Sequence, residues 1–287
     1  MTSRHSRAVV GSYNIAMASV EDVRKYWNDH PLFSFEVAEP GSPEFFAQID
    51  RIKHEDVEPF ALRYWEFDRF HGKRVLDVGC GPGWLTVQYA AGGADVTAVD
   101  LTPRAVELAT QFLAHRGLTA TVREGNAEAL PFADNTFDLV ASSGVLHHTP
   151  DTPRAIRECC RVLKPGGTGK LTFYYKGILH SPLVFPLTRL GMRLAGVKHP
   201  GADMAKDAND ADTFIRQYDG ADNPVGVGYT IREWTRVLRE AGFEVLGHER
   251  HFFPRRFIPM SALVPRPVHH LLDATLGTMV YFRLRKR

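Results

Sequence analysis

The stretch from Val75 to Gly83, VLDVGCGPG, constrains the fold more than any other part of the chain. A short apolar run leads directly into three glycines at alternate positions, Gly79, Gly81 and Gly83. Because glycine has no Cβ, it lets the backbone turn sharply and approach a ligand closely. The pattern predicts a buried strand that ends in a pocket for an adenosine-bearing cofactor.

An acidic residue in this run indicates which cofactor binds. Asp77 precedes the glycines, where its carboxylate would repel a diphosphate and attract a cationic amino-acid group. A dinucleotide-binding turn also requires Gly or Ala at position 84, which is Trp84 here. Asp100 ends the next apolar run, where an acid accepts hydrogen bonds from ribose hydroxyls. These residues favour a nucleoside without phosphates.

From residue 73 onward, short β-branched runs alternate with amphipathic segments, which predicts parallel strands joined by helices. We expect strands at 74–78, 95–100, 119–124, 137–142, 169–175, 243–250 and 278–285. We expect helices over 84–91 and from Thr102 to 115, another capped by Thr152, and one opened by the capping box Thr230-x-x-Glu233. The fold class is α/β, a doubly wound and mostly parallel seven-stranded sheet.

Three segments fall outside this alternation. We expect residues 1–70 to form a helical N-terminal cap and residues 71–287 to form the cofactor-binding domain. Within that domain, residues 177–229 are a long insertion, and residues 253–277 carry four prolines. Because long irregular segments in compact domains are commonly lids or binding surfaces, we expect 177–229 to act as a lid.

Composition narrows the class of protein. The chain has 287 residues, of which 44% are apolar and 24% charged, as in ordinary globular domains. It contains no uncharged apolar run of about 18 residues, so no membrane span is expected. Its three cysteines, two of them adjacent, make no sensible disulfide framework and suit a reducing compartment. We expect a cytoplasmic protein of unknown oligomeric state.

Four motifs, in order, resemble the class I S-adenosylmethionine-dependent methyltransferases, in particular the bacterial small-molecule branch near the ubiquinone and menaquinone enzymes (methyltransferase type 11). They are VLDVGCGPG at 75–83, VTAVDLTPRAVELA at 96–109, GNAEALPFADNTFDLV at 125–140 and VLHHTPDTPRAIRECCRVLKPGG at 145–167. The resemblance covers about residues 73–175. It implies the Rossmann-like sheet of that family, with its last strand antiparallel, and S-adenosylmethionine as the cofactor.

The resemblance also implies a set of cofactor contacts. Asp77 and Gly79 would hold the methionine end and Asp100 the ribose, while Leu101 would pack on the adenine. The adenine edge would be read by Asn126 and by the Ala127 amide. The family usually has Asp at position 126, but an amide oxygen can still accept a hydrogen bond from the adenine amino group. The further cofactor contacts expected are Cys80, Gly81, Gly83, Glu128 and Ser143.

Two histidines, His147 and His148, follow the fourth expected strand at the sheet edge where ligands bind. Methyl transfer from a sulfonium mainly requires alignment, exclusion of water and, for some acceptors, removal of a proton. One of the pair is the candidate general base, with a structural role as the alternative. Tyr26 is a third catalytic candidate. Other aromatic residues expected over the site are Tyr13, Trp27, Phe33 and Phe35, with Tyr174, Tyr175, Tyr218 and Tyr229 as weaker lid candidates; core packing is the alternative for each.

The expected reaction is methyl transfer to a small molecule, most readily at oxygen. The fourth strand is followed by Ser142-Ser143-Gly144-Val145 in place of the Asn/Asp-Pro-Pro-aromatic run of nucleic-acid amine methylases, which argues against DNA. From His248 onward, eight Lys/Arg oppose two acids, so an anionic acceptor or RNA stays open. Methylation at N, C or S, an NAD-dependent dehydrogenase and a binding module without turnover stay open as well.

The remaining histidines do not indicate a metal site. His248-x-x-His251 and His269-His270 lack acidic or cysteine partners at useful spacing. The first pair falls on an expected strand, where residues three apart point to opposite faces. No metal is expected.

Overall fold

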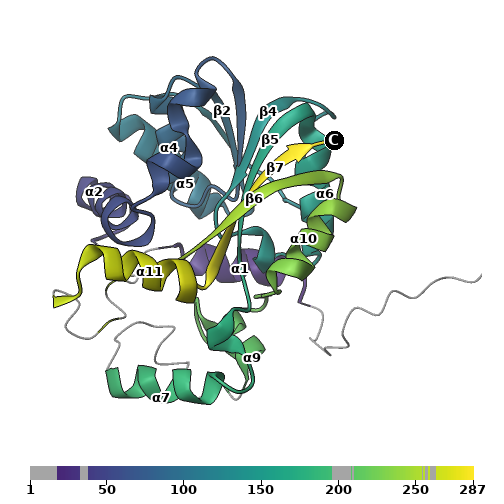
Figure 1. Ribbon diagram of the computed structural model, residues 1–287. Helices are drawn as coiled ribbons and strands as arrows, with labels where there is room; N and C mark the ends of the chain where they lie inside the picture. Colours follow the sequence, from purple (N-terminus) through teal and green to yellow (C-terminus); the bar gives the residue numbers. More distant parts are fainter. Residues whose placement is uncertain are drawn as a thin grey trace, which may run out of the picture.

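The seven strands form one sheet in the order β3-β2-β1-β4-β5-β7-β6 (Figure 1). The structure is a computed structural model that describes residues 18–32, 38–195, 208, 210–253, 255, 258 and 263–287. The strands are β1 (Arg74–Val78), β2 (Asp95–Asp100), β3 (Thr121–Glu124), β4 (Phe137–Ser142), β5 (Leu163–Tyr174), β6 (Phe243–His251) and β7 (Met279–Lys286). Tyr13, Phe33 and Phe35 lie outside the described residues.

Strands β1 to β5 are parallel to one another, whereas β7 is antiparallel to both β5 and β6. The carboxyl ends of β1 and β4 therefore lie at the same edge of the sheet, next to that of β2. The expected doubly wound α/β fold is confirmed, including the antiparallel last strand.

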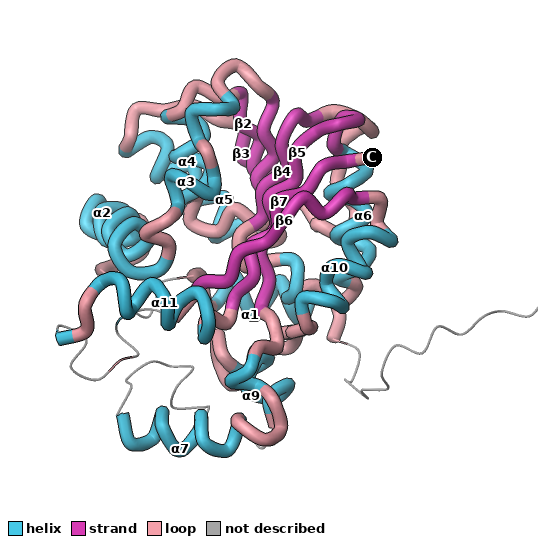
Figure 2. Tube along the Cα trace, in the orientation of Figure 1, coloured by secondary structure: helices cyan, strands magenta, loops and turns pink. Residues whose placement is uncertain are grey.

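Helices cover both faces of the sheet (Figures 1 and 2). On one face α4 and α5 pack with the N-terminal helices, and on the other lie α6 and α10. The helices are α1 (Val20–Asp29), α2 (Pro43–Ile52), α3 (Ala61–Trp65), α4 (Trp84–Ala91), α5 (Pro103–His115), α6 (Thr152–Val162), α7 (Phe185–Ala195), α9 (Ala211–Gln217), α10 (Ile231–Glu240) and α11 (Arg266–Leu276). The short turns are η1 (Lys53–Val57), η2 (Phe67–Phe70), η3 (Leu146–His148) and η4 (Ile178–His180).

Local capping explains where these helices begin, with one correction. Thr102 caps α5 by accepting from the amide of Ala105, and Thr230 forms the expected capping box with Glu233. The expected N-cap Thr152 is wrong, because the side chain of Asp151 accepts from the Arg154 amide instead. Aspartate is as good an N-cap as threonine or better. The N-cap of α6 is therefore residue 151, one residue before the expected one.

Strand β5 also begins earlier than expected, at Leu163 rather than Gly169. Leu163 pairs with Phe137 of β4, and regular pairing resumes only at Thr168. Gly166, with φ of 73°, lets the chain leave the sheet between these two points. The Lys-Pro-Gly-Gly run is thus an interruption within the strand and not its preceding turn.

The N-terminal helices share a core with the sheet. Buried side chains of α2 and α3, among them Phe45, Phe46 and Trp65, belong to the same apolar cluster as those of α4 and α5. Trp84 Nε1 of α4 donates to Asp50 Oδ1 of α2 at 3.0 Å. Helices α1, α2 and α3 lie within residues 1–70, while the cap and its boundary at residue 70 stay predictions.

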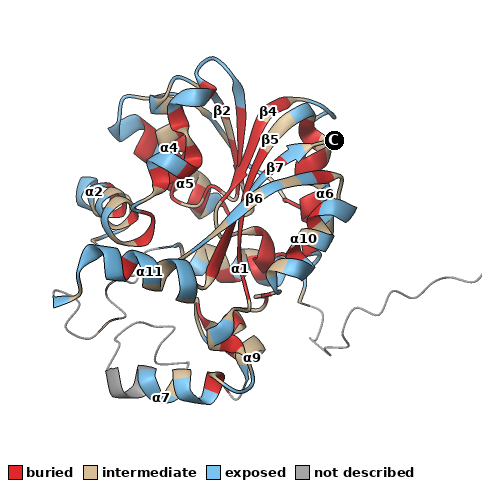
Figure 3. Cartoon of the chain, in the orientation of Figure 1, coloured by how far each residue is buried: buried red, intermediate tan, exposed pale blue. Residues whose placement is uncertain are grey.

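Helices α1 and α9 lie below the carboxyl ends of the parallel strands, which run downward in Figure 1. The inserted segment contributes η4, α7 and α9, and α11 follows β6. Figure 3 shows buried residues along the central strands and exposed ones along much of α7 and α11. Among the described residues, no helix combines the length and apolar character that crossing a bilayer requires.

Gly83 provides a test of how α4 packs on α5. Its φ is 90°, and a Cβ placed on it would lie 2.8 Å from both Cα and Cβ of Ala109. Gly117, with φ of 63°, has nothing within 4 Å of the same atom. We expect Gly117→Ala to lose about 1 kcal/mol from backbone strain, and Gly83→Ala to lose about 1–3 kcal/mol more from the collision. Urea unfolding measures both, and equal losses would contradict this packing.

Candidate active site

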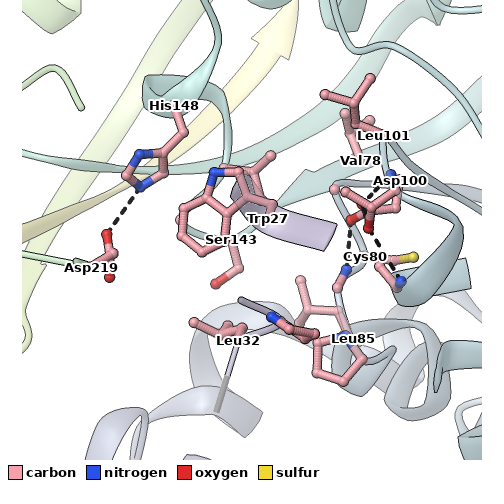
Figure 4. Close-up of a pocket in the computed structure, with 18 of the residues that line it drawn as sticks. Trp27, Leu32, Val78, Cys80, Leu85, Asp100, Leu101, Ser143, His148 and Asp219 are labelled. Atoms are coloured by element: carbon pink, nitrogen blue, oxygen red, sulfur yellow. Dashed lines mark hydrogen bonds and ion pairs between the residues drawn. The ribbon is translucent and has the colours of Figure 1, made fainter. Parts of the chain in front are cut away.

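A cavity opens at the carboxyl ends of β1, β2 and β4, where Asp77, Asp100 and Ser143 lie. The turn after β1 forms one wall, and α1 with the residues after α9 forms another. Figure 4 shows Asp100 and Leu101 at one end, His148 and Asp219 at the other, and Trp27 and Ser143 between them. The cavity therefore brings together residues from the sheet, the N-terminal segment and the insertion.

The glycine-rich turn is held by its own backbone amides. Gly79 and Cys80 donate to the Val99 carbonyl oxygen at 2.8 and 3.1 Å. Gly81 donates to Asp100 Oδ2 at 2.9 Å, and the Gly83 amide donates to the Cys80 carbonyl. Position 82 is proline, which has no N–H. Each N–H between residues 79 and 83 thus has a partner within the protein, which agrees with the sequence-based preference for a ligand without a diphosphate.

The three glycines of the turn have different surroundings. At Gly81 a Cβ would meet nothing within 4 Å, so the backbone there faces open space in the cavity. At Gly79 it would lie 2.2 Å from Cγ1 of Val145. Gly83 packs on Ala109 and does not line the cavity. The structure thus brings Gly79 and Gly81 to the site, and gives Gly83 a role in helix packing.

Two carboxylates lie at this end of the cavity. Asp77 is buried, and Thr86 Oγ1 donates to its Oδ2 at 2.7 Å. Burial raises the pKa of Asp77 from 3.8 to about 7, although the Thr86 hydrogen bonds oppose the shift. Asp100 accepts from the Gly81 amide and from the amide and hydroxyl of Thr102, yet burial still raises its pKa. A cationic ligand would favour the ionised form of both acids.

Of the residues expected to contact the adenine, some line the cavity and one does not. Leu101, Asn126 and Ala127 line the cavity. Asn126 Oδ1 accepts from the Glu128 amide at 2.9 Å, which leaves its second lone pair for a ligand. Glu128 is not among the lining residues, because its carboxylate accepts from the Asp151 amide at 2.7 Å and joins this loop to the start of α6.

A buried ion pair that the sequence did not reveal forms the floor beside Ser143. Lys53 Nζ lies 2.7 Å from Glu58 Oε1, and both residues line the cavity. Glu58 also accepts from Trp65 Nε1 at 2.5 Å and from Ser143 Oγ at 3.3 Å. Lys53 and Glu58 lie five residues apart across a π-helical turn, a spacing that no α-helical pattern marks. Cys80 lines the cavity as expected, and burial raises the pKa of its thiol.

His148 lies in the cavity wall with both ring nitrogens in contact. Its Nδ1 lies 2.7 Å from the Val225 carbonyl oxygen, and its Nε2 lies 3.2 Å from Asp219 Oδ2. Because a carbonyl only accepts, Nδ1 carries a proton, and in the neutral ring Nε2 is the nitrogen that can take one up. The indole of Trp27 packs against this ring with centroids 5.1 Å apart.

The other two catalytic candidates do not line the cavity. His147 is fully buried between the rings of His148 and Tyr174, and neither ring nitrogen has a hydrogen-bond partner among the described residues. Burial lowers its pKa well below the usual value, which keeps the ring neutral. Tyr26 donates from its hydroxyl to the Asp219 carbonyl oxygen at 2.6 Å, and burial raises its pKa to about 12.

Several of the expected aromatic residues reach the site. Trp27, Tyr174 and Tyr218 line the cavity, together with Phe252. Tyr175 is not among the lining residues and instead forms a bridge with Tyr229, which is also absent from the wall. The apolar wall around His148 therefore combines α1, the end of β5 and the residues after α9.

The described basic residues near the C-terminus do not line the cavity. Arg283 and Arg285 form ion pairs with Glu249 and Glu244 of the neighbouring strand β6. Lys286 donates to the carbonyl oxygens of residues 161 and 163. These contacts are the cross-strand and edge contacts of a sheet surface.

Comparison with known proteins supports one family. Residues 76–169 match the family model described as a methyltransferase domain. An uncharacterized protein of Mycobacterium tuberculosis is 44% identical over 97 residues, covering 34% of this chain and 35% of that protein. A ubiquinone biosynthesis O-methyltransferase of Alkalilimnicola ehrlichii is 27% identical over 244 residues, covering 81% of this chain and 96% of the relative.

A solved structure has the same fold. A SAM-dependent methyltransferase of Methanosarcina mazei aligns with a TM-score of 0.53 and 22% identity over 80% of this chain and 98% of its own. Together these matches support a class I S-adenosylmethionine-dependent methyltransferase. This chain spans about a third of the mycobacterial relative's length, so that match supports no particular reaction.

The residues present fit the cofactor of this methyltransferase family. The turn offers open space at Gly81 and satisfies its own amides, as a ligand without a diphosphate allows. Asp77 lies where a cationic amino group would favour its charge, and Asp100 retains acceptor capacity for hydroxyl groups. These features suit an amino acid joined to a nucleoside.

Protonation of Asp77 makes cofactor binding depend on pH. With a pKa of about 7 in the empty cavity, this carboxyl is mostly protonated at pH 6 and mostly ionised at pH 8. We expect the Kd for S-adenosylhomocysteine, measured by calorimetry, to fall up to about tenfold over that range. Asp77→Asn should remove this dependence and bind more weakly at pH 8. A wild-type Kd that rises with pH would contradict the assignment.

The same carboxyl has the opposite effect on stability of the empty protein. Its pKa rises from 3.8 to about 7 on folding, so the folded form binds the proton more tightly than the unfolded chain. Its contribution is therefore present below about pH 4 and is lost as pH rises through 7. Asp77→Asn should flatten that part of the stability profile in denaturant unfolding.

Proposed function

We propose that this chain transfers the methyl group of S-adenosylmethionine to a hydroxyl oxygen of an uncharged small molecule. The observation that carries the proposal is one cavity with the glycine turn and Asp100 at one end and His148 with Asp219 at the other. The proposed cofactor-binding residues and a group that can take up a proton thus line the same cavity. The O-methyltransferase name of the Alkalilimnicola relative supports oxygen as the methylated atom.

The cofactor-binding residues we propose lie on the turn and the two loops that follow it. Asp77 and Gly79 hold the methionine part, Asp100 holds the ribose, and Leu101 packs on the adenine. Asn126 and Ala127 bind the adenine edge, with Cys80, Gly81 and Ser143 completing the wall. When bound, the cofactor supplies an electrophilic methyl group on a sulfonium whose sulfur leaves as a neutral thioether.

His148 is the general base in this proposal. A neutral hydroxyl becomes a better nucleophile as it loses its proton, and the pair formed by His148 and Asp219 receives that proton. The resulting imidazolium is stabilised on both sides, by the Val225 carbonyl at Nδ1 and by the Asp219 carboxylate at Nε2. A base at this position is useful for an oxygen acceptor, whose proton must leave.

The charges of the lining favour an uncharged acceptor over an anionic one. Four acids line the cavity, Glu58, Asp77, Asp100 and Asp219, and among the described lining residues Lys53 is the sole Lys or Arg. Its charge is already compensated by Glu58. Trp27, Tyr218 and Phe252 give the acceptor end an apolar wall. A flat, mainly apolar molecule with a hydroxyl group fits these surroundings.

Ligand selectivity tests the cofactor assignment. Because a ligand that binds only the native state raises its stability, we expect S-adenosylhomocysteine to raise the Tm and NAD⁺ to leave it unchanged. Differential scanning fluorimetry with both ligands at equal concentration measures this. The matched variant Gly81→Val, which projects a side chain into the open space of the turn, should lose the response. A rise with NAD⁺ alone would support a dehydrogenase.

Separate substitutions of His148 and His147 test which histidine acts as the general base. We expect His148→Gln to lower kcat at least about 100-fold while S-adenosylhomocysteine affinity stays within a few-fold, since the ring lies away from the cofactor end. Methylation is followed with methyl-labelled S-adenosylmethionine and a panel of phenols, alcohols, amines and thiols.

His147→Leu is the matched control, because its ring makes no hydrogen bond to the described residues and an apolar side chain can replace it. We expect its kcat to stay within a few-fold of the wild type. Similar losses in both variants would contradict the role of His148. Binding of S-adenosylhomocysteine with no methylation of any acceptor would favour a binding module.

A further inference from the structure

We infer that Asp219 is a positioning residue, which fixes the ring of His148 from the inserted segment and stabilises its protonated form. The inference rests on the proposed function, in which His148 is the base. Asp219 belongs to none of the four sequence motifs and follows α9, in the segment 177–229. Three elements far apart in the sequence meet at this residue.

The carboxylate of Asp219 has two partners at the cavity. Oδ2 lies 3.2 Å from Nε2 of His148 on η3. The hydroxyl of Tyr174, at the end of β5, donates to Oδ2 at 2.9 Å and lies 3.1 Å from Oδ1. Burial raises the pKa of Tyr174 well above its usual value, so this hydroxyl keeps its proton and remains a donor. A hydroxyl donor favours the ionised form of a carboxylate.

The backbone of Asp219 ties the same segment to the N-terminal part of the chain. Its carbonyl oxygen accepts from the Tyr26 hydroxyl of α1 at 2.6 Å. A Cβ on the next residue, Gly220, would lie 1.9 Å from the same hydroxyl oxygen, and Gly220 has φ of 140°. Only glycine lets the chain pass Tyr26 this closely. The position of Asp219 is therefore fixed independently of its contact with His148.

The opposite side of the imidazole is bound by the same inserted segment. Nδ1 donates to the carbonyl oxygen of Val225, and the Val227 amide donates to the carbonyl of His147 at 3.0 Å. Asn223, fully buried, orders this stretch by accepting from the Val225 amide at 3.3 Å. One segment of chain thus contacts both ring nitrogens, which fixes the orientation of the ring.

The charged form of His148 then has a partner at each nitrogen, and Asp219 supplies the charge. The other titratable groups that face the ring are His147 on the same turn and Tyr174 on β5, and both stay neutral near pH 7. From α1 the ring meets Trp27, which does not titrate. Asp219 is thus the charged group in contact with this ring among the described residues, so loss of its charge should favour the neutral imidazole.

Nitrogen NMR of the histidine rings tests this pairing without a known acceptor. The full-length chain, labelled with ¹⁵N in its histidines, is titrated as wild type, Asp219→Asn and Asp222→Asn, and the His148 signal is assigned by its loss in His148→Gln. Asp222 is the matched control, because it is exposed on the same segment. We expect Asp219→Asn to move the midpoint of the His148 titration to lower pH, since an opposite charge is removed. Asp222→Asn should leave it in place.

A midpoint unchanged in Asp219→Asn, or moved equally in Asp222→Asn, would overturn the inference. Should Asp219→Asn fail to fold, Asp219→Ser removes the same charge and still accepts from Tyr174. Asp219→Glu, which keeps the charge, should return the midpoint toward the wild type. If the midpoint moves as expected but no acceptor is methylated, the proposed reaction fails while the pairing of Asp219 with His148 stands.

Discussion

The hydrogen bonds that fold the glycine turn back onto β2 are the interaction on which the rest of the site depends. The amides of Gly79 and Cys80 bind the carbonyl of Val99, and the Gly81 amide binds the side chain of Asp100. These bonds fix the turn before any ligand arrives, and they orient the second carboxylate at the same time. They also pair the amides of residues 79–81 within the protein, as a ligand without a diphosphate allows.

Much of the central fold could be predicted from the sequence, because its signals are local. Strands β1, β2 and β4 and helices α4 and α5 lie where alternation, threonine caps and glycine stops place them. The errors are also local in origin. Asp151 caps α6 because it competes with Thr152 for the same amides, and β5 gains its first pair at Leu163 because Gly166 permits an irregular excursion.

The sequence predicted only those charged site residues that belong to the four sequence motifs. Asp77, Asp100 and the cavity side of the turn lie at strand ends, and the parallel order of the sheet brings strand ends together. Asp219 and the Lys53–Glu58 pair come from segments without periodicity, and their positions depend on contacts with partners far away in the sequence. The sequence also could not distinguish His147 from His148, since both are buried and only the folded structure shows that His148 lines the cavity.

The place of β7 in the sheet has a consequence for how the protein forms during synthesis. The last strand of the chain lies between β5 and β6, and β6 pairs with no other strand among the described residues. Until the ribosome has released Met279 and the residues after it, the edge of β5 stays open and β6 has no sheet to join. The sheet is therefore completed only after β6 has been synthesised. A stop codon before β7 would remove this strand and would also leave β6 without a strand to pair with.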